Sequence, residues 1–175
     1  MEIIQTNNSN YRTSIIELYI EAFSTGQSEQ YIDLDEVNNY IDSILKDGYA
    51  IITTEKEMVT GAILLCPLYL DKVLLKEIKT TFDIEKCLYV AEMMVAEKVR
   101  GQGISKQLLT AFFEKVYKTR YSDVFIRVWI ENIPAVNLYT KMGFQTIANI
   151  EQTKKTADGT GTFVMQKIYL HKKLN

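Results

Sequence analysis

The sequence contains one histidine and two cysteines in 175 residues, which removes several kinds of catalytic and metal chemistry. A Ser-His-Asp or Cys-His arrangement would have to use His171, and no GxSxG segment is present to accompany it. Cys66 and Cys87 have neither zinc-ligand nor CxxC spacing and lie in apolar stretches. We therefore expect no metal site, a solvated His171 in a C-terminal tail, and cysteines that act as small core residues.

The sequence also lacks a large net charge and a long apolar run. A formal net charge of -2 gives no electrostatic reason to bind nucleic acid or an anionic membrane surface. No apolar run approaches the roughly 20 residues of a membrane-spanning helix, and residues 1–10 lack the regions of a secretory signal. We expect a cytoplasmic protein with no nucleic-acid or membrane partner, folded as one domain over residues 1–175.

Apolar periodicity predicts a strand, two helices and a hairpin in the first half of the chain. Asp33 and Glu36 have the spacing of a capping box at the start of the second helix, which Gly48 ends. Pro67 is expected at a strand end or on an edge. The predicted segments are a strand at 2–6, a helix at 10–23, a loop at 24–31, a helix up to Gly48, and strands at 49–55 and 58–70.

The second half alternates strands and helices before a final hairpin. Residues 71–86 are charged and leave room for a short helix, and Asp158-Gly159 is a turn signal between the last two strands. The segment 123–130 is apolar on both faces, which favours a central or parallel strand. The other predicted segments are strands at 87–96, 144–153 and 161–170 and helices at 104–116 and 133–143. This order predicts a mixed sheet with helices packed on it.

The segment VRGQGIS at 99–105 joins a strand ending near Ala96 to a helix beginning near Ile104. One interpretation is a plain turn whose glycines supply unusual backbone angles. A GxGxxG dinucleotide motif fails because Lys106 occupies the third glycine position, and a Walker motif is absent. The alternative is an anion cradle, in which amides at a helix N-terminus bind phosphate and Arg100 adds positive charge. The strand-to-helix context favours this anion cradle.

Two segments resemble motifs of the GNAT acyltransferase superfamily. In the first, Arg100, Gly103 and Ser105 occupy the places of Q/R-x-x-G-x-G/A, with serine where glycine or alanine is usual. The second is similar to N-x-x-A-x-x-L-Y-x-x-x-G-F, and its matching residues are Asn132, Ala135, Leu138, Tyr139, Gly143 and Phe144. The resemblance implies an α+β fold with one mixed, mostly antiparallel sheet of six to seven strands and about four helices.

This resemblance implies acetyl-CoA, or another acyl-CoA, as co-substrate and a primary amine as acceptor. In the family, the glycine loop binds the diphosphate, and the preceding strand splays away from its neighbour so that its main-chain groups hold the pantetheine arm. A backbone N–H of Met94 or Val95 would donate to the thioester carbonyl, where negative charge develops. The cofactor-binding residues carried over to this sequence are Met93, Met94, Val95, Arg100, Gly101, Gln102, Gly103, Ile104, Ser105 and Asn132.

Glu92 is the candidate general base. An alkylamine has a pKa of about 10.4, so it is mostly protonated at neutral pH and must lose a proton before attack. In an extended strand Glu92 shares a face with Val90 and Met94, and burial there would raise the pKa of its carboxyl. It would act directly or through a water. The alternatives are that this end of the strand opens into solvent or that Glu92 pairs with a lysine.

Tyr139 is the candidate general acid. It matches the family tyrosine that protonates the departing thiolate, and a phenol with an ordinary pKa of about 10 can serve a thiol of about 8.5. The alternative is that Tyr139 is a core residue in an apolar stripe with Val136 and Met142. Asn132 could cap the following helix, contact the cofactor arm, or do both.

By the same resemblance, the loop at 24–31 and the insertion at 71–86 would flank the acceptor. Their acidic residues would suit a cationic amine, although lysines in the insertion weaken that argument. The acidic residues are Glu29, Asp71, Glu77, Asp83 and Glu85, and the lysines are Lys72, Lys76, Lys79 and Lys86.

The sequence thus predicts an N-acetyltransferase that moves an acetyl group from acetyl-CoA directly to a primary amine of a small molecule or a protein. We expect a monomer or a homodimer. The main rival is a non-catalytic acyl-CoA-binding or regulatory module of the same fold, and a further rival is a generic nucleotide-binding protein.

Overall fold

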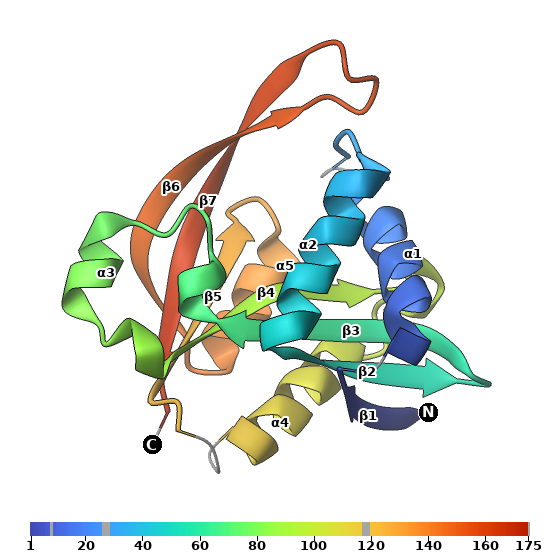
Figure 1. Ribbon diagram of the computed structural model, residues 1–175, viewed down its shortest axis with the longest axis horizontal. Coiled ribbons are helices and arrows are strands. Elements are labelled where there is room, and N and C mark those ends of the chain that lie inside the picture. The colour runs from blue at the N-terminus through green and yellow to red at the C-terminus, as the bar shows by residue number, and fades with distance from the viewer. Residues whose placement is uncertain (8, 26–28, 117–119, 175) are drawn as a thin grey trace.

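The computed structural model describes residues 1–7, 9–25, 29–116 and 120–174, and a seven-stranded sheet forms its centre (Figure 1). The strands are β1 (Glu2–Thr6), β2 (Tyr49–Glu55), β3 (Met58–Pro67), β4 (Cys87–Val95), β5 (Asp123–Trp129), β6 (Gln145–Lys155) and β7 (Thr162–Lys173). Their order in the sheet is β1-β2-β3-β4-β5-β7-β6. β4 and β5 are parallel, and the other neighbouring strands are antiparallel. This confirms the predicted mixed, mostly antiparallel sheet.

Five helices pack around this sheet in the described part of the chain, and side-chain caps explain where two of them begin. They are α1 (Arg12–Phe23), α2 (Leu34–Asp47), α3 (Lys76–Thr81), α4 (Ile104–Val116) and α5 (Ile133–Lys141). At the start of α2, Asp33 Oδ1 accepts hydrogen bonds from the backbone N–H groups of Asp35 and Glu36, both at 3.0 Å. At the start of α5, Asn132 Oδ1 accepts from the N–H of Ala135 at 3.3 Å.

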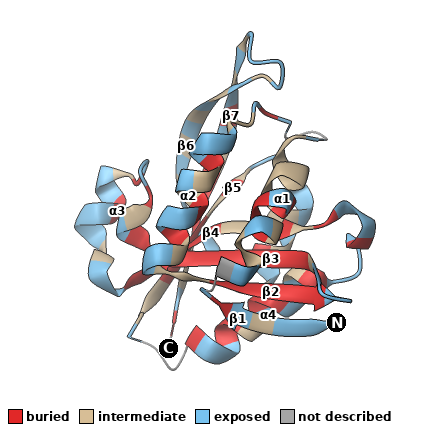
Figure 2. Ribbon diagram, turned by 45° about the vertical axis from the view of Figure 1, so that its right-hand side comes forward, coloured by how far each residue is buried: buried red, intermediate tan, exposed pale blue. Residues whose placement is uncertain are grey.

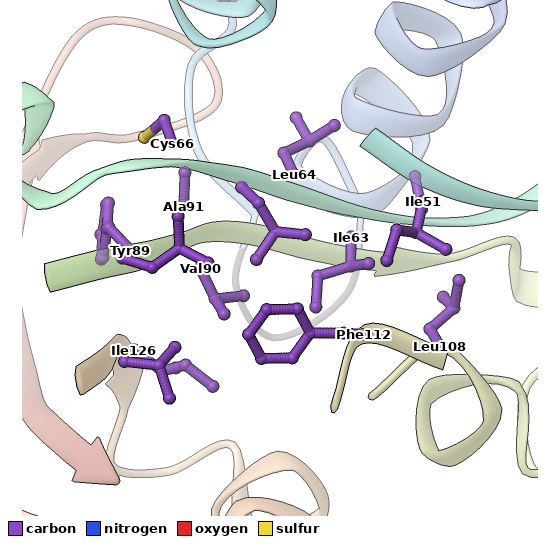
Figure 3. Close-up of a cluster of buried hydrophobic side chains, with 14 of the residues drawn as sticks. Ile51, Ile63, Leu64, Cys66, Tyr89, Val90, Ala91, Leu108, Phe112 and Ile126 are labelled. Atoms are coloured by element: carbon purple, nitrogen blue, oxygen red, sulfur yellow. The ribbon is translucent and has the colours of Figure 1, made fainter. Parts of the chain in front are cut away.

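The two faces of the sheet carry different helices. α1 and α2 lie on one face and α4 lies on the other (Figure 1). In the close-up, Ile63 and Val90 project toward Phe112 of α4, whereas Leu64 projects to the opposite side (Figure 3). Because side chains alternate along a strand, β2 and β3 bury residues against helices on both faces, and the core lies along these strands (Figure 2).

The cysteines, the proline and the charged insertion are placed as predicted. Cys66 and Cys87 are buried, and burial raises the pKa of both thiols to about 12. Pro67 ends β3, and the insertion at 71–86 contains the short helix α3. Within the ranges that the structure describes, no helix is long and apolar enough to cross a bilayer.

His171 does not lie in a solvated tail, so that prediction was wrong. Strand β7 pairs with β5 as far as the partners Lys173 and Asp123, three residues beyond the expected end of the strand at 170. The Nε2 atom of His171 lies 2.7 Å from Oδ1 of Asp123, and its ring packs against Phe82 and Phe125. Polar residues near a chain end look like a tail in the sequence, but pairing with a distant strand keeps them ordered.

Candidate active site

A cleft opens where β4 and β5 part. Their parallel pairing ends at Val90 and Ile126, although β4 continues to Val95 and β5 to Trp129. The cleft at this opening has a volume of about 890 Å³. Beyond Val90, therefore, β4 has no strand partner on the β5 side, and main-chain groups along that edge are free to bind a ligand.

Most of the site residues predicted from the sequence line this cleft. Gln102 is the exception, since it is exposed and lies outside the cleft lining. The predicted residues that line the cleft are Glu92, Met93, Met94, Val95, Arg100, Gly101, Gly103, Ile104, Ser105, Asn132 and Tyr139.

The glycine loop lies at one end of the cleft, immediately before α4. Gly101 and Gly103 have φ angles of 78° and 79°, in the left-handed region that favours glycine. An added Cβ at either position would meet no atom within 4 Å, so the requirement for glycine comes from the backbone conformation. The N–H of Gln107 donates to the carbonyl of Gly103 at 3.1 Å, which leaves the amides of residues 104–106 without acceptors inside the helix. Such free amides bind anions.

Positive side chains accompany these amides. Arg100 is exposed and lines the cleft, and its Nε donates to the backbone carbonyl of Val95 at 3.1 Å. Lys106 also lines the cleft. Asn132 both caps α5 and lines the cleft, so its two expected roles are compatible in this geometry. This end of the cleft therefore combines free backbone amides with cations, which suits a diphosphate.

A β-bulge turns Glu92 toward the face that carries α2. On β3, Leu64 pairs with Glu92 while the next residue, Leu65, pairs with Val90, so Ala91 is left without a partner. Because paired residues share a face, Glu92 and Val90 lie on opposite faces. Figure 3 shows Val90 and Ala91 projecting to opposite sides of β4. The expectation that Glu92 shares a face with Val90 was wrong. It assumed that side chains alternate strictly between the two faces of the strand, and the bulge inserts one extra residue.

Glu92 is half-buried and hydrogen-bonded. The hydroxyl of Tyr40, on α2, donates to Glu92 Oε1 at 2.9 Å. Burial raises the pKa of the Glu92 carboxyl, while the positive charge of Lys167 and the Tyr40 hydrogen bond act in the opposite direction. No described lysine lies within 4 Å of the carboxylate, so the alternative of a lysine ion pair is not found. A carboxyl whose pKa rises toward neutrality is suited to accept a proton.

Tyr139 lies on α5 and is buried, with 6% of its surface exposed. Its hydroxyl lies 3.8 Å from the Sδ atom of Met93, the residue that follows Glu92 on β4. Burial raises the pKa of the Tyr139 phenol, and the negative charge of Glu92 adds to the effect. The hydroxyl therefore keeps its proton at neutral pH and has only a weak thioether acceptor in the described structure, which leaves it able to donate to a ligand.

None of the acidic residues expected to face a cationic acceptor lines the cleft. Asp71 instead forms a buried ion pair: Nη1 of Arg127 donates to both of its carboxylate oxygens, at 2.7 and 2.8 Å. The hydroxyl of Tyr169 donates to the same carboxylate at 2.7 Å. The side chain of Asp71 is 2% exposed, so its charge is neutralised inside the protein rather than offered to an amine. For Asp71 the expectation of an acidic acceptor wall was therefore wrong.

Two cleft residues were missed in the sequence, although a signal for each was present. Arg127 interrupts the apolar strand VFIRVW, and Lys167 interrupts the apolar positions Met165 and Tyr169 on one face of β7. A charge placed among apolar strand positions needs a partner or a function. The same argument selected Glu92, and applied to every strand it would have found both residues.

The remaining predicted acceptor segment lies partly outside the described residues, which omit 26–28 of the loop at 24–31. Where the loop is described, the N–H of Gln30 donates to the carbonyl of Phe23 at 3.0 Å, and the N–H of Tyr31 donates to the carbonyl of Lys155 at 3.2 Å. Gln30 lines the cleft. The end of α1 is thus connected to β6 across one side of the cleft.

The fold and the cleft together define a class of protein. The mostly antiparallel sheet parts between two parallel strands, and a glycine loop and a helix N-terminus lie at the opening. The two motifs led us to expect this arrangement for an acyl-CoA-dependent transferase. The profile of the acetyltransferase (GNAT) family matches residues 12–144, and the chain belongs to this family.

Curated relatives match over shorter segments. An N-alpha-acetyltransferase from Sulfurisphaera tokodaii is 34% identical over 79 residues, which are 44% of this chain and 46% of that protein. N-alpha-acetyltransferase 30 from Saccharomyces cerevisiae is 32% identical over 56 residues, which are 32% of each chain. The matched segments therefore span less than half of these relatives.

Solved structures match over nearly the whole chain. The ribosomal-protein-alanine N-acetyltransferase from Brucella melitensis superposes with a TM-score of 0.75 at 15% identity, covering 99% of this chain and 100% of that one. The protein yncA from Salmonella typhimurium, whose structure contains its cofactor acetyl-CoA, has a TM-score of 0.72 at 14% identity, covering 100% and 95%. At these identities the likeness shows the fold, and family membership supports acetyl transfer from an acyl-CoA as the general chemistry.

Proposed function

We propose that the protein transfers the acetyl group of acetyl-CoA to a primary amine by direct attack in a ternary complex. The observation that carries this proposal is the placement of a carboxylate and a protonated phenol on one cleft, Glu92 from β4 and Tyr139 from α5. The cleft passes between parted strands, so side chains from both faces of the sheet can reach the same reacting centre. The two groups supply the proton acceptor and the proton donor that amine acylation by a thioester needs.

The cofactor end of the cleft fits an acyl-CoA. The free amides of residues 104–106 and the guanidinium of Arg100 would hold the diphosphate. The unpaired edge of β4 at residues 93–95 would hydrogen-bond the pantetheine arm, and the N–H of Met94 or Val95 would donate to the thioester carbonyl. Acetyl-CoA supplies an activated acyl group, and these protein groups orient it and stabilise the charge that develops on its oxygen.

Glu92 and Tyr139 would then carry out the two proton transfers of the reaction. Glu92 accepts the proton of the acceptor ammonium, directly or through a water, and its raised pKa brings it closer to the operating pH. Tyr139 donates to the departing thiolate, since its own pKa keeps it protonated. An alkylamine, with a pKa of about 10.4, depends on this base more than a peptide α-amine of about 7.7–8.0. The names of the two relatives above place a peptide α-amine among the acceptors to test.

The test is a turnover screen in which acetyl-CoA and a panel of amines are combined and free thiol is measured. We expect thiol release with at least one amine, and a fall in kcat of roughly 10²- to 10⁴-fold in Glu92→Gln, with CoA affinity retained. Tyr139→Phe should also lower kcat at unchanged CoA affinity. Glu97→Gln is the matched control, because Glu97 is exposed and lies outside the cleft lining.

Two outcomes would contradict the proposal. If CoA raises the melting temperature but no amine in the panel releases thiol, the chain is a non-catalytic acyl-CoA-binding module. If Glu92→Gln and Glu97→Gln turn over like the unmodified protein, the base lies elsewhere.

A further inference from the structure

The end of the cleft at Glu92, where the acceptor would bind, also contains a lysine. Lys167 lines the cleft together with Glu92. In the sheet, Lys167 pairs with Trp129 and Tyr169 pairs with Arg127, so Lys167 and Arg127 lie on one face. Lys167 and Glu92 therefore line one cleft, where burial raises the pKa of the Glu92 carboxyl and the lysine charge lowers it.

Lys154 lies further along the β6–β7 hairpin, outside the cleft lining, where it lines a smaller pocket with Asp33 and Glu36. Ile150 of β6 pairs with Lys167, and Lys154 lies four residues further along the same strand. An even spacing keeps Lys154 on the face of Ile150, and therefore of Lys167. Lys154 is half-buried, and its charge also acts on Glu92.

The charged groups that act on Lys167 are the cations Lys154 and Arg127 and the carboxylates Glu92 and Asp71. Arg127 and Asp71 neutralise each other in their buried ion pair. Glu36 acts on Lys154, and the two residues line the same smaller pocket, which leaves Glu92 as the carboxylate that faces Lys167.

Neither ammonium group is paired within the protein. Among the described residues, no carboxylate lies within 4 Å of Lys154 or Lys167. Burial and the like charge of Lys154 lower the pKa of Lys167 to about 8, so its charged form is held at a cost in free energy. A substrate carboxylate beside Lys167 would supply the partner that this ammonium group lacks.

We propose that the acceptor carries a carboxylate a few bonds from its amine, and that Lys167, assisted by Lys154, binds this carboxylate while Glu92 faces the amine. This inference rests on the proposed function and names its substrate class. The carboxylate could belong to a small amino acid or to an acidic side chain at the N-terminus of a peptide. Polyamines and other polycations are excluded, because their further ammonium groups would lie beside Lys167 without a carboxylate partner.

The experiment compares matched pairs of acceptors with the unmodified protein by free thiol release. The small-molecule pair is 4-aminobutyrate and butylamine, and the peptide pair differs only in an N-terminal aspartate or asparagine. We expect kcat/KM to be at least about tenfold higher for the carboxylate member of one pair, as a charge-assisted contact provides. The pair that shows the preference identifies the source of the carboxylate.

Lysine variants then test whether the lysines of the β6–β7 hairpin cause the preference for the carboxylate member. Lys167→Met should remove most of the preference and Lys154→Met part of it, measured as the ratio of kcat/KM within a pair, so that a change in Glu92 common to both acceptors cancels. Lys173→Met is the matched control, because Lys173 is an exposed lysine on the same strand and lies outside the cleft lining. The comparison of substrates on the unmodified protein needs no variant, so it remains decisive if Lys167→Met folds poorly.

The outcomes separate this inference from the proposed function. Turnover of amines without a preference for the carboxylate members, or with spermidine as the best acceptor, overturns the inference and leaves the proposed function standing. A carboxylate preference that survives in both lysine variants also overturns it. If no amine is acetylated although CoA binds, the proposed function fails and this inference fails with it.

Discussion

The two ends of the cleft are built by different means. The cofactor end consists mostly of main-chain groups from one continuous segment, residues 93–106, held open by the backbone angles of Gly101 and Gly103. The acceptor end consists of side chains from segments that are far apart in the sequence, with Tyr40 on α2, Glu92 on β4 and Lys167 on β7. A main-chain site tolerates many side chains, whereas a site of charged side chains depends on each of its members.

This difference explains which end a sequence motif can describe. The cofactor end needs a few residues at fixed spacing, because local backbone geometry determines where its amides lie. The acceptor end needs charges whose balance is set by burial and by partners on other elements. Three experiments test this difference between the two ends, and they follow in order of expected effect.

Asp71→Asn should produce the largest effect, on the stability of the whole fold. It leaves the guanidinium of Arg127 buried without its counter-charge, which costs about 3–5 kcal/mol in the free energy of unfolding. Urea denaturation measures this loss, while the folded fraction should still bind CoA.

The control for that experiment is Asp42→Asn, which breaks the exposed ion pair with Arg12. The side chains of Asp42 and Arg12 are 53% and 30% exposed, against 2% and 13% for Asp71 and Arg127. An exposed pair contributes little, so we expect a much smaller loss. Equal losses in the two variants would show that burial does not make the Asp71–Arg127 pair more important to stability than the exposed pair.

The double variant Arg100→Ala, Gly103→Val should abolish stabilisation by CoA. At a CoA concentration of about 100 Kd, ligand binding adds roughly 2.7 kcal/mol to the stability of the unmodified protein, and thermal melts detect it. The variant removes a cation and places a β-branched residue at a φ of 79°. Gly159→Val, at a φ of 72° in the turn between β6 and β7, is the control that carries similar strain away from the cofactor end. A double variant that responds to CoA like the unmodified protein would show that the loop does not bind the diphosphate.

Tyr40→Phe should produce the smallest effect, since one hydrogen bond contributes about 1 kcal/mol. The Tyr40 hydroxyl favours the ionised form of Glu92 and so lowers the pKa of that carboxyl, and its removal lets the pKa rise. A base works only when deprotonated, so the acid limb of the kcat/KM profile should move to higher pH while the alkaline side stays unchanged. Tyr49→Phe, on β2, is the control. A shift to lower pH, or the same shift in both variants, would contradict the role of Glu92 as base.

Much of the fold could be predicted from the sequence. The strand and helix order, the caps at Asp33 and Asn132, a central or parallel strand at 123–130 and the parting of β4 and β5 were all expected, and the structure confirms each of them. These features follow from local periodicity and from short motifs, so nearby residues contain the necessary information.

Other features could not be predicted, because they arise from pairing between distant strands. The bulge at Ala91 depends on the register of β3 against β4, and the environment of His171 depends on how far β7 follows β5. The neutralisation of Asp71 by Arg127 joins segments 56 residues apart.

By itself, the sequence determined the elements of this protein and the loop that would hold an acyl-CoA, because helix starts, glycine turns and free amides are local properties of the chain. The tertiary structure was needed to show which way Glu92 faces, that Lys167 lines the same cleft, and which charges have no ion-pair partner among the described residues. The physical reason is that the cost and the partner of a charge are set by what is packed around it, and those neighbours come from the whole chain.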